Sequence, residues 1–129
     1  MKQTIFKDKY PLWSLQLQKD EIKFSTTNEI VDYFIKKIIA HPIATYITTF
    51  DHYKHTTSLE EHKIAPDIKD VKNIIFCFGK EILDTKVAAI RPRSIAVCEL
   101  ESSFVIEFLE APNEKLHITM EEWAKSLKK

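Results

Sequence analysis

The chain has 129 residues, 44% of them hydrophobic and 29% charged, which suits one domain with its own hydrophobic core. Its 19 basic and 19 acidic side chains cancel, which excludes a strong overall field for attracting nucleic acid or an anionic membrane. No apolar run reaches the roughly 20 residues of a membrane span, and residues 1–13 lack a signal-peptide core, so we expect a single cytoplasmic domain over residues 1–129.

The first part of the chain predicts a strand, a helix and a second strand. In Leu12–Gln18 apolar and polar side chains alternate, as they do in a half-buried strand. Thr26 and Glu29 have the spacing of a capping box, and apolar residues then recur at helical spacing until Pro42 ends the helix. The segment Ile43–Phe50 is rich in β-branched and aromatic residues, which favour a strand.

The middle of the chain is first polar and then strongly apolar. Residues 51–72 predict at most a short helix, which Thr57 or Ser58 would cap. The segment Lys72–Gly79 contains a continuous apolar run, which is typical of a central strand covered on both faces. After it, apolar residues on one side of Lys80–Ile90 predict another helix.

The last part of the chain predicts a hairpin followed by a helix. Ser94–Leu100 and Phe104–Leu109 both alternate and are joined by a tight reversal, so they should pair in antiparallel fashion. A final helix is expected over Thr119–Lys129, because its first residue and Glu122 repeat the capping-box spacing. Its apolar side carries Trp123, which we expect to be buried against the sheet.

Strands and helices do not alternate strictly along this chain, which indicates an α+β fold and not a doubly wound parallel sheet. We therefore expect a single antiparallel sheet of about five strands, with an early helix and a C-terminal helix packed on it.

Several short motifs connect these elements to a known family. From about Phe24 to the C-terminus they are Phe50-Asp51-His52 after a strand, Pro66 before the next, Ile75-Phe76-Cys77-Phe78-Gly79, Pro92 before a strand ending in Cys98-Glu99, and Phe104–Glu107 in the hairpin. In these motifs the chain resembles the domain-of-unknown-function 302 family, small bacterial and archaeal domains with a TATA-binding-protein-like β-α-β4-α layout. It departs from that family in having Lys80-Glu81 in place of Asn-Pro, and in an apparent insertion at residues 67–71. The resemblance implies a bacterial protein with a curved sheet around the C-terminal helix, assembled as a homodimer, and it implies no established activity.

Four polar residues after the second predicted strand form the first candidate site. They are Asp51, His52, His55 and His62, and imidazole groups can bind a metal or transfer a proton near neutral pH. The alternative is a polar loop in which Asp51 caps the chain and the histidines contact water. The two other histidines sit at the ends of elements and are expected at the surface.

The only two arginines form the second candidate site. Arg91 and Arg93 flank Pro92, and two guanidinium groups on a rigid loop could hold a phosphate or a carboxylate. The alternative is a pair of surface charges. Because Gly79 is the only glycine, a Gly-rich phosphate loop or dinucleotide fingerprint is excluded.

Sulfur and aromatic groups give two weaker candidates. Cys77 and Cys98 lie in predicted strands, where buried reduced thiols are expected; the alternative is a redox or metal pair facing across neighbouring strands. Trp13, Tyr46 and Trp123 could line an apolar pocket between sheet and helix, or belong to the core.

These observations predict a non-enzymatic domain that binds a small molecule or a protein partner and forms a homodimer. The expected ligand-binding residues are Asp51, His52, His55, Arg91 and Arg93, with no catalytic residue, metal ligand or cofactor assigned. The alternative is an enzyme or metal-dependent site built on Asp51, His52 and His55. The neutral charge balance argues against nucleic acid as a partner and the hydropathy against a membrane.

Overall fold

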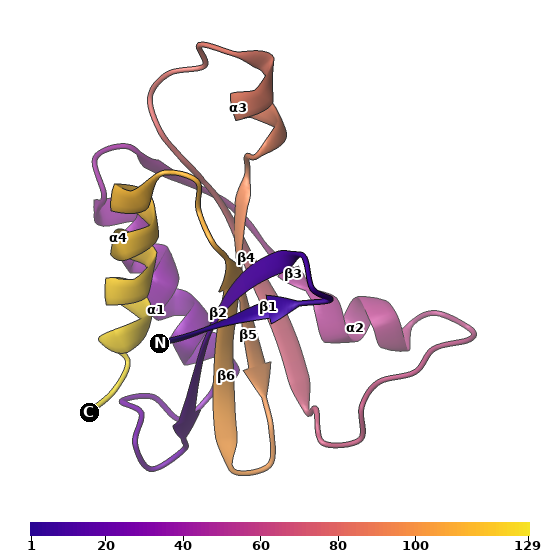
Figure 1. Cartoon of the computed structure of the whole chain (residues 1–129). Coiled ribbons are helices and arrows are strands. Elements are labelled where there is room, and N and C mark those ends of the chain that lie inside the picture. Colours follow the sequence, from indigo (N-terminus) through magenta and orange to yellow (C-terminus); the bar gives the residue numbers. More distant parts are fainter.

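One open antiparallel sheet of six strands forms the centre of the protein, and two long helices cover one of its faces (Figure 1). The computed structural model describes all residues, 1–129. The elements in chain order are β1 (Lys2–Phe6), β2 (Tyr10–Gln18), α1 (Thr27–Ala40), β3 (Ala44–Asp51), α2 (His52–Thr57), β4 (Asp70–Phe78), α3 (Thr85–Ala89), β5 (Arg93–Glu99), β6 (Ser103–Leu109) and α4 (Glu114–Lys125).

The strands are ordered β1-β2-β6-β5-β4-β3, and every neighbouring pair is antiparallel. The predicted α+β class and antiparallel sheet are therefore confirmed, whereas the count of about five strands is one short. The missed strand is β1, which pairs with β2 through a turn at Lys7 and Asp8, both at positive φ. Every residue of β1 is exposed, so no apolar alternation marks it in the sequence.

Helix α1 begins where the sequence predicts. The Thr26 hydroxyl accepts the backbone N–H of Glu29 at 3.1 Å, and the Glu29 carboxylate accepts the N–H of Ser25 at 3.3 Å. The first bond satisfies a donor that the first turn of a helix leaves free, and the second holds the residue that precedes the cap. No helix in the protein is long and apolar enough to cross a membrane.

The other helices differ from the prediction in their bounds. The sequence predicted that a short helix would begin at a cap on Thr57 or Ser58. In the structure, helix α2 is capped by Asp51, begins at His52 and ends at Thr57. Helix α3 covers only part of the predicted range and is capped by Asp84. Helix α4 starts five residues before Thr119 because Asn113 caps it, accepting the N–H of Leu116 at 3.2 Å. The Thr119 hydroxyl instead donates to the carbonyl oxygen of Lys115 within the helix.

The core lies between the inner face of the sheet and helices α1 and α4, and its largest fully buried side chains include Phe34, Phe76, Phe78 and Phe104. Trp123 of α4 is 8% exposed, and its ring stacks on Phe78 with centroids 5.3 Å apart. The prediction that the terminal helix packs on the sheet through this tryptophan is confirmed.

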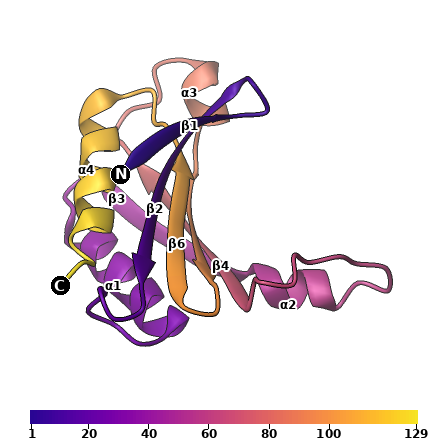
Figure 2. The same ribbon diagram turned by 60° about the horizontal axis from the view of Figure 1, so that its bottom comes forward.

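The outer face of the sheet is turned away from α1 and α4. In Figure 2 these helices lie to the left of the sheet, while α2 and the tip of the β1–β2 hairpin project to its right. Because side chains alternate along a strand, each buried residue of the inner face has neighbours that point to this outer face. The two faces therefore carry different chemistry.

Candidate functional site

The two arginines form the second candidate site from the sequence, and neither forms an ion pair with a carboxylate. Every ion pair in the protein uses a lysine or a histidine as its cation. Arg91 precedes β5 and Arg93 is its first residue. Their guanidinium groups are therefore free of internal neutralisation at one end of the sheet.

Arg91 lies directly over the only glycine of the chain. A Cβ placed on Gly79 would lie 2.6 Å from Cζ and 2.9 Å from Nη1 of Arg91, closer than side chains tolerate. Gly79 also has φ of +110°, a backbone conformation that other residues rarely adopt. Nη1 of Arg91 donates to the carbonyl oxygen of Glu81 at 2.9 Å, which fixes the guanidinium across the turn.

An open cleft of about 520 Å³ lies beside this guanidinium, and we call it the arginine cleft. Its walls come from the loop after β4, from α3 and from the first turns of α4; the lining residues include Gly79, Lys80, Glu81, Leu83, Val87, Arg91, Lys115 and Leu116. Three of these residues are cationic and one is acidic, and none of the cations takes part in an ion pair. The positive end of the α4 dipole lies at the same place. The arrangement can attract and hold an anion.

Arg93 contributes to a different part of the surface. It donates through Nη2 to the carbonyl oxygen of Leu109, while its Nε is buried without a partner, and burial lowers the pKa of this arginine. The cleft that it lines, about 590 Å³, also contains the carboxylates of Glu107 and Glu110. Arg91 and Arg93 both line a small cavity of about 40 Å³, but the large clefts beside them are separate. The two guanidinium groups thus do not converge on one anion.

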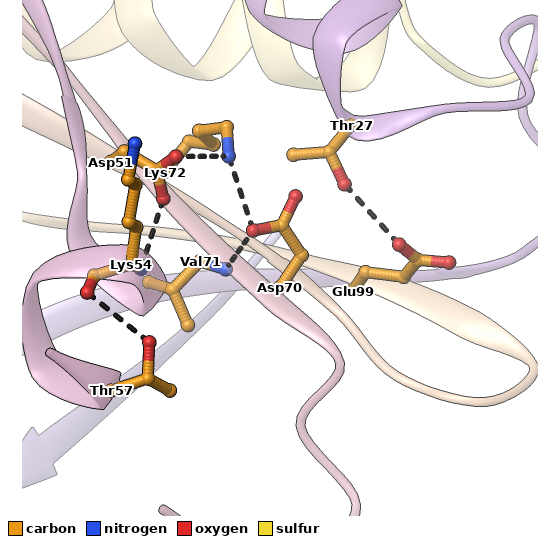
Figure 3. A network of polar contacts seen from close by, with 8 residues as sticks. All are labelled: Thr27, Asp51, Lys54, Thr57, Asp70, Val71, Lys72 and Glu99. Atoms are coloured by element: carbon orange, nitrogen blue, oxygen red, sulfur yellow. Dashed lines mark hydrogen bonds and ion pairs between the residues drawn. The ribbon is translucent and has the colours of Figure 1, made fainter.

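The structure separates Asp51 from His52 and His55. Oδ1 of Asp51 caps α2 by accepting the N–H of Lys54 at 3.1 Å, and Oδ2 lies 3.2 Å from Nζ of Lys72. The bond from the Lys54 backbone N–H, with the nearby Lys72 ammonium, lowers the pKa of Asp51. Figure 3 shows Lys72 between Asp51 and Asp70. No group of three or more His, Cys, Asp or Glu side chains is placed to hold a metal ion.

His52 turns to the opposite side of the sheet from Asp51. Its Nδ1 lies 2.8 Å from Oδ1 of Asn73, whose side chain points outward because its neighbour Ile74 points into the core. The rings of His52 and His55 both pack on Phe50, with centroids 5.1 Å and 5.4 Å from it. Asp51 is the last residue of β3 and His52 is the first residue of α2, so their side chains point to opposite sides of the sheet although they are neighbours in the sequence.

The cysteines and aromatic residues also occupy separate places. Cys77 and Cys98 are free thiols, and the register places Cys98 opposite Val71, so the two do not face each other across β4 and β5. Burial raises the pKa of Cys98 to about 11. Trp13 does not lie beside Trp123 but against His117, with ring centroids 4.7 Å apart.

The expectation that the remaining histidines, His41 and His117, lie at the surface is wrong for His117. It is only 6% exposed, because α4 begins earlier than predicted and carries it over the sheet. Its Nε2 lies 3.1 Å from Oε1 of Glu121, one helical turn further on.

Sequence reasoning identified Arg91 but missed Lys80 and Lys115, which complete the cationic wall of the arginine cleft. Lys115 could have been found only with the correct start of α4, for which Asn113 after Pro112 is the available signal. The single glycine is the second signal, because a lone Gly at the end of an apolar strand indicates a turn or a close approach of another group.

Comparison with known proteins identifies the family and nothing more specific. No curated protein and no solved structure gives a significant match to this chain. The predicted resemblance to the domain-of-unknown-function 302 family is not confirmed, although β2, α1, β3–β6 and α4 follow the β-α-β4-α order with β1, α2 and α3 added. A family model described as a family of unknown function (DUF6858) matches residues 1–129, and the chain belongs to that family.

Proposed function

We propose that this protein is a non-enzymatic binding domain that holds a small phosphate- or carboxylate-bearing molecule in the arginine cleft. The observation that carries the proposal is the unpaired charge: Lys80, Arg91 and Lys115 line one cleft with a single carboxylate, Glu81. In a chain whose total charge is zero, such a local excess makes that cleft the favoured place for an anion. Arg91 supplies a planar fork of donors that matches a phosphate or carboxylate.

The arginine cleft is also lined by one histidine, His41, and the contacts of its imidazole support a binding role. Nδ1 of His41 accepts the backbone N–H of Ile43 at 3.3 Å. Its ring packs edge-on against Phe78 with centroids 5.1 Å apart. These contacts give His41 a structural part in the wall of the cleft, and the lysines and the arginine remain as the groups that meet a ligand.

Isothermal titration calorimetry with inorganic phosphate and with citrate at low ionic strength tests this proposal. An Arg91→Gln variant should bind roughly ten- to a hundredfold more weakly, since a hydrogen bond to a charged group contributes about 1.5–3 kcal/mol. Lys36→Gln is the matched control, because Lys36 is an exposed lysine of α1 away from the cleft. Equal affinities for wild type and Arg91→Gln, or no heat with either anion, would contradict the proposal.

We also propose that two copies of the chain pair through the outer face of the sheet. On the four central strands β2, β6, β5 and β4, the only charged side chain that alternates onto that face is Glu107; the others are Tyr10, Leu12, Ser14, Gln16, Gln18, Ser103, Val105, Leu109, Ser94, Ala96, Cys98, Val71, Asn73, Ile75 and Cys77. Depletion of charge at the centre of a surface is what distinguishes interfaces between proteins. Glu107 itself accepts a 2.6 Å hydrogen bond from the Ser14 hydroxyl.

The size of the face suits a dimer of two like surfaces. Strands about 4.8 Å apart with a rise of about 3.3 Å per residue give the four central strands a projected area on the order of 500 Å² and the whole sheet one on the order of 700 Å², so the pairing approaches the roughly 800 Å² per partner of a standard interface only if the edge strands take part. Light scattering should give the mass of a dimer for the wild type. An Ala96→Lys variant, which places a charge at the centre of the face, should give a monomer. A wild-type protein that remains monomeric at high concentration would refute the pairing.

A further inference from the structure

The loop between β4 and α3 presents two aliphatic side chains to solvent beside the arginine cleft. Leu83 is 83% exposed and Ile82 is 71% exposed, the highest values among the large apolar side chains of the protein. Single exposed apolar residues are common on protein surfaces and need no explanation. What distinguishes this pair is its place next to cations that have no partner.

Leu83 lines the same cleft as Arg91, and Ile43, Val87 and Leu116 extend the apolar part of its wall. One part of the cleft is therefore cationic and the other is aliphatic. Ile82 lines an adjoining cleft of about 420 Å³ that also contains Arg91. Arg91 thus lines two clefts, and each of them also has an exposed aliphatic side chain in its wall.

The loop that carries these side chains projects from the end of the sheet with α3, as Figure 1 shows. It has no regular structure between Phe78 and Thr85. Its bonds to the rest of the protein include the one from Arg91 to the Glu81 carbonyl oxygen. An apolar group of a ligand that packs against Leu83 would remove its own surface and that of Leu83 from water. The fold would not have to change, because Leu83 lies in a loop and not in a packed helix or strand.

We infer that the ligand is an amphiphilic anion, with a phosphate or carboxylate head at Arg91 and a hydrocarbon body along Leu83, Val87 and Leu116. This inference rests on the proposed function, because it takes the arginine cleft as the binding site and adds the class of molecule. A bare phosphate or a compact polar carboxylate would leave the aliphatic wall in water. A hydrocarbon body instead gains the free energy of apolar burial, which is roughly a fourfold increase in affinity for each methylene group fully removed from water.

A matched series of ligands tests the inference by calorimetry: inorganic phosphate, butyl phosphate, octyl phosphate below its micelle concentration, and octanol. Octyl phosphate should bind at least tenfold more tightly than phosphate, with butyl phosphate between them, and octanol should not bind measurably. Leu83→Ser should remove most of the gain with chain length and leave the affinity for phosphate unchanged. Ile39→Ser, a change to a similarly exposed aliphatic residue on α1, should change neither.

Failure of this inference is distinguishable from failure of the proposed function. If phosphate binds in an Arg91-dependent manner but octyl phosphate binds no more tightly, the amphiphilic ligand is refuted and the anion site stands. If no member of the series binds in an Arg91-dependent manner, both are refuted. Leu83 and Ile39 are exposed, so their replacement leaves the packed core intact. Arg91 is half-buried, so circular dichroism and thermal unfolding of each variant, Arg91→Gln included, confirm that it is folded before its binding is compared.

A further arm identifies the source of the ligand. Co-sedimentation with vesicles of phosphatidylcholine containing phosphatidic acid, lost in Leu83→Ser, would identify a head group presented by a lipid surface. Binding of monomeric octyl phosphate without co-sedimentation would identify a free amphiphile. Both results support the same ligand chemistry.

Discussion

Replacing Gly79 by alanine should displace the Arg91 guanidinium. The resulting loss of stability can be separated from the cost of holding alanine at a positive φ, because only the first depends on Arg91. The new Cβ would lie 2.6 Å from Cζ of Arg91, well inside van der Waals contact. Because the obstructing atoms are at the far end of a flexible side chain, the arginine can move aside. In moving, it loses its 2.9 Å hydrogen bond to the Glu81 carbonyl oxygen.

The expected loss of stability has two parts. Holding alanine at a φ of +110° costs about 1–3 kcal/mol, and the lost hydrogen bond costs about 1 kcal/mol. Gly79→Ala should therefore lower the free energy of unfolding by about 2–4 kcal/mol. In an Arg91→Ala background only the backbone strain remains, so the same change should cost about 1 kcal/mol less.

Urea denaturation of the wild type, the two single variants and the double variant gives this coupling energy, and a phosphate titration of each shows its consequence for binding. Gly79→Ala should weaken phosphate binding several-fold, because the guanidinium no longer borders the cleft. A Gly79→Ala cost that is identical with and without Arg91, together with unchanged phosphate affinity, would show that the guanidinium does not lie over Gly79 in solution.

Three further predictions concern the rest of the fold. Lys72→Met should lower the free energy of unfolding by about 1–2 kcal/mol at pH 7, because the carboxylates of Asp51 and Asp70 share this largely buried ammonium. The bond from the Lys54 backbone N–H, with the Lys72 ammonium as a further cause, lowers the pKa of Asp51. The stability that the Asp51 carboxylate contributes is therefore present above the unfolded pKa of about 3.9 and is lost as the pH falls through the lower folded value, so the difference between wild type and Lys72→Met in urea unfolding should shrink steadily as the pH is lowered from 7 towards 2; a difference that does not change with pH would refute the assignment. Because partial burial raises the pKa of Cys98 to about 11, iodoacetamide at pH 8 should label this half-buried thiol much more slowly in the native protein than in urea, and equal labelling rates by mass spectrometry would contradict the raised pKa. Trp123→Ala should lower stability by about 3–5 kcal/mol in thermal or urea unfolding, since it removes an 8%-exposed ring stacked in the core, and a loss below 1 kcal/mol would mean that α4 is not docked on the sheet.

The elements that the sequence predicted correctly are those with a strong periodic signal of their own. The apolar run of β4 and the alternation of β5 and β6 identify strands, and the capping box at Thr26 identifies the start of α1. The strand β1 is held by pairing with β2 and exposes all of its side chains, so its stability comes from a partner and not from its own pattern. Tertiary pairing of this kind leaves no mark in a single segment.

Local capping signals were less reliable than periodicity. Thr119 and Glu122 have the capping-box spacing, yet Thr119 lies inside α4 and bonds one turn back. Asn113, which does cap the helix, follows Pro112 and could be taken equally well for the end of the preceding hairpin. Misplacing this start also hid Lys115 from the predicted site and left His117 outside the predicted core.

Proximity in sequence was a poor guide to the candidate sites. Asp51 and His52 are neighbours along the chain, but one pairs with Lys72 while the other bonds Asn73 on the outer face. Arg91 and Arg93 also separate onto different clefts. The cationic wall beside Arg91 combines residues from three distant segments, which only the folded structure brings together.

The most direct test of the anion site uses the single glycine. Since Gly79 is the only one, its amide gives an isolated signal in a ¹H–¹⁵N correlation spectrum, and phosphate can be titrated while that signal is followed. The proposal predicts a saturable shift of Gly79, with shifts in the first turn of α4, that is lost in Arg91→Gln and kept in Lys36→Gln. A Gly79 signal that does not move, or that moves equally in Arg91→Gln, would contradict anion binding in the arginine cleft.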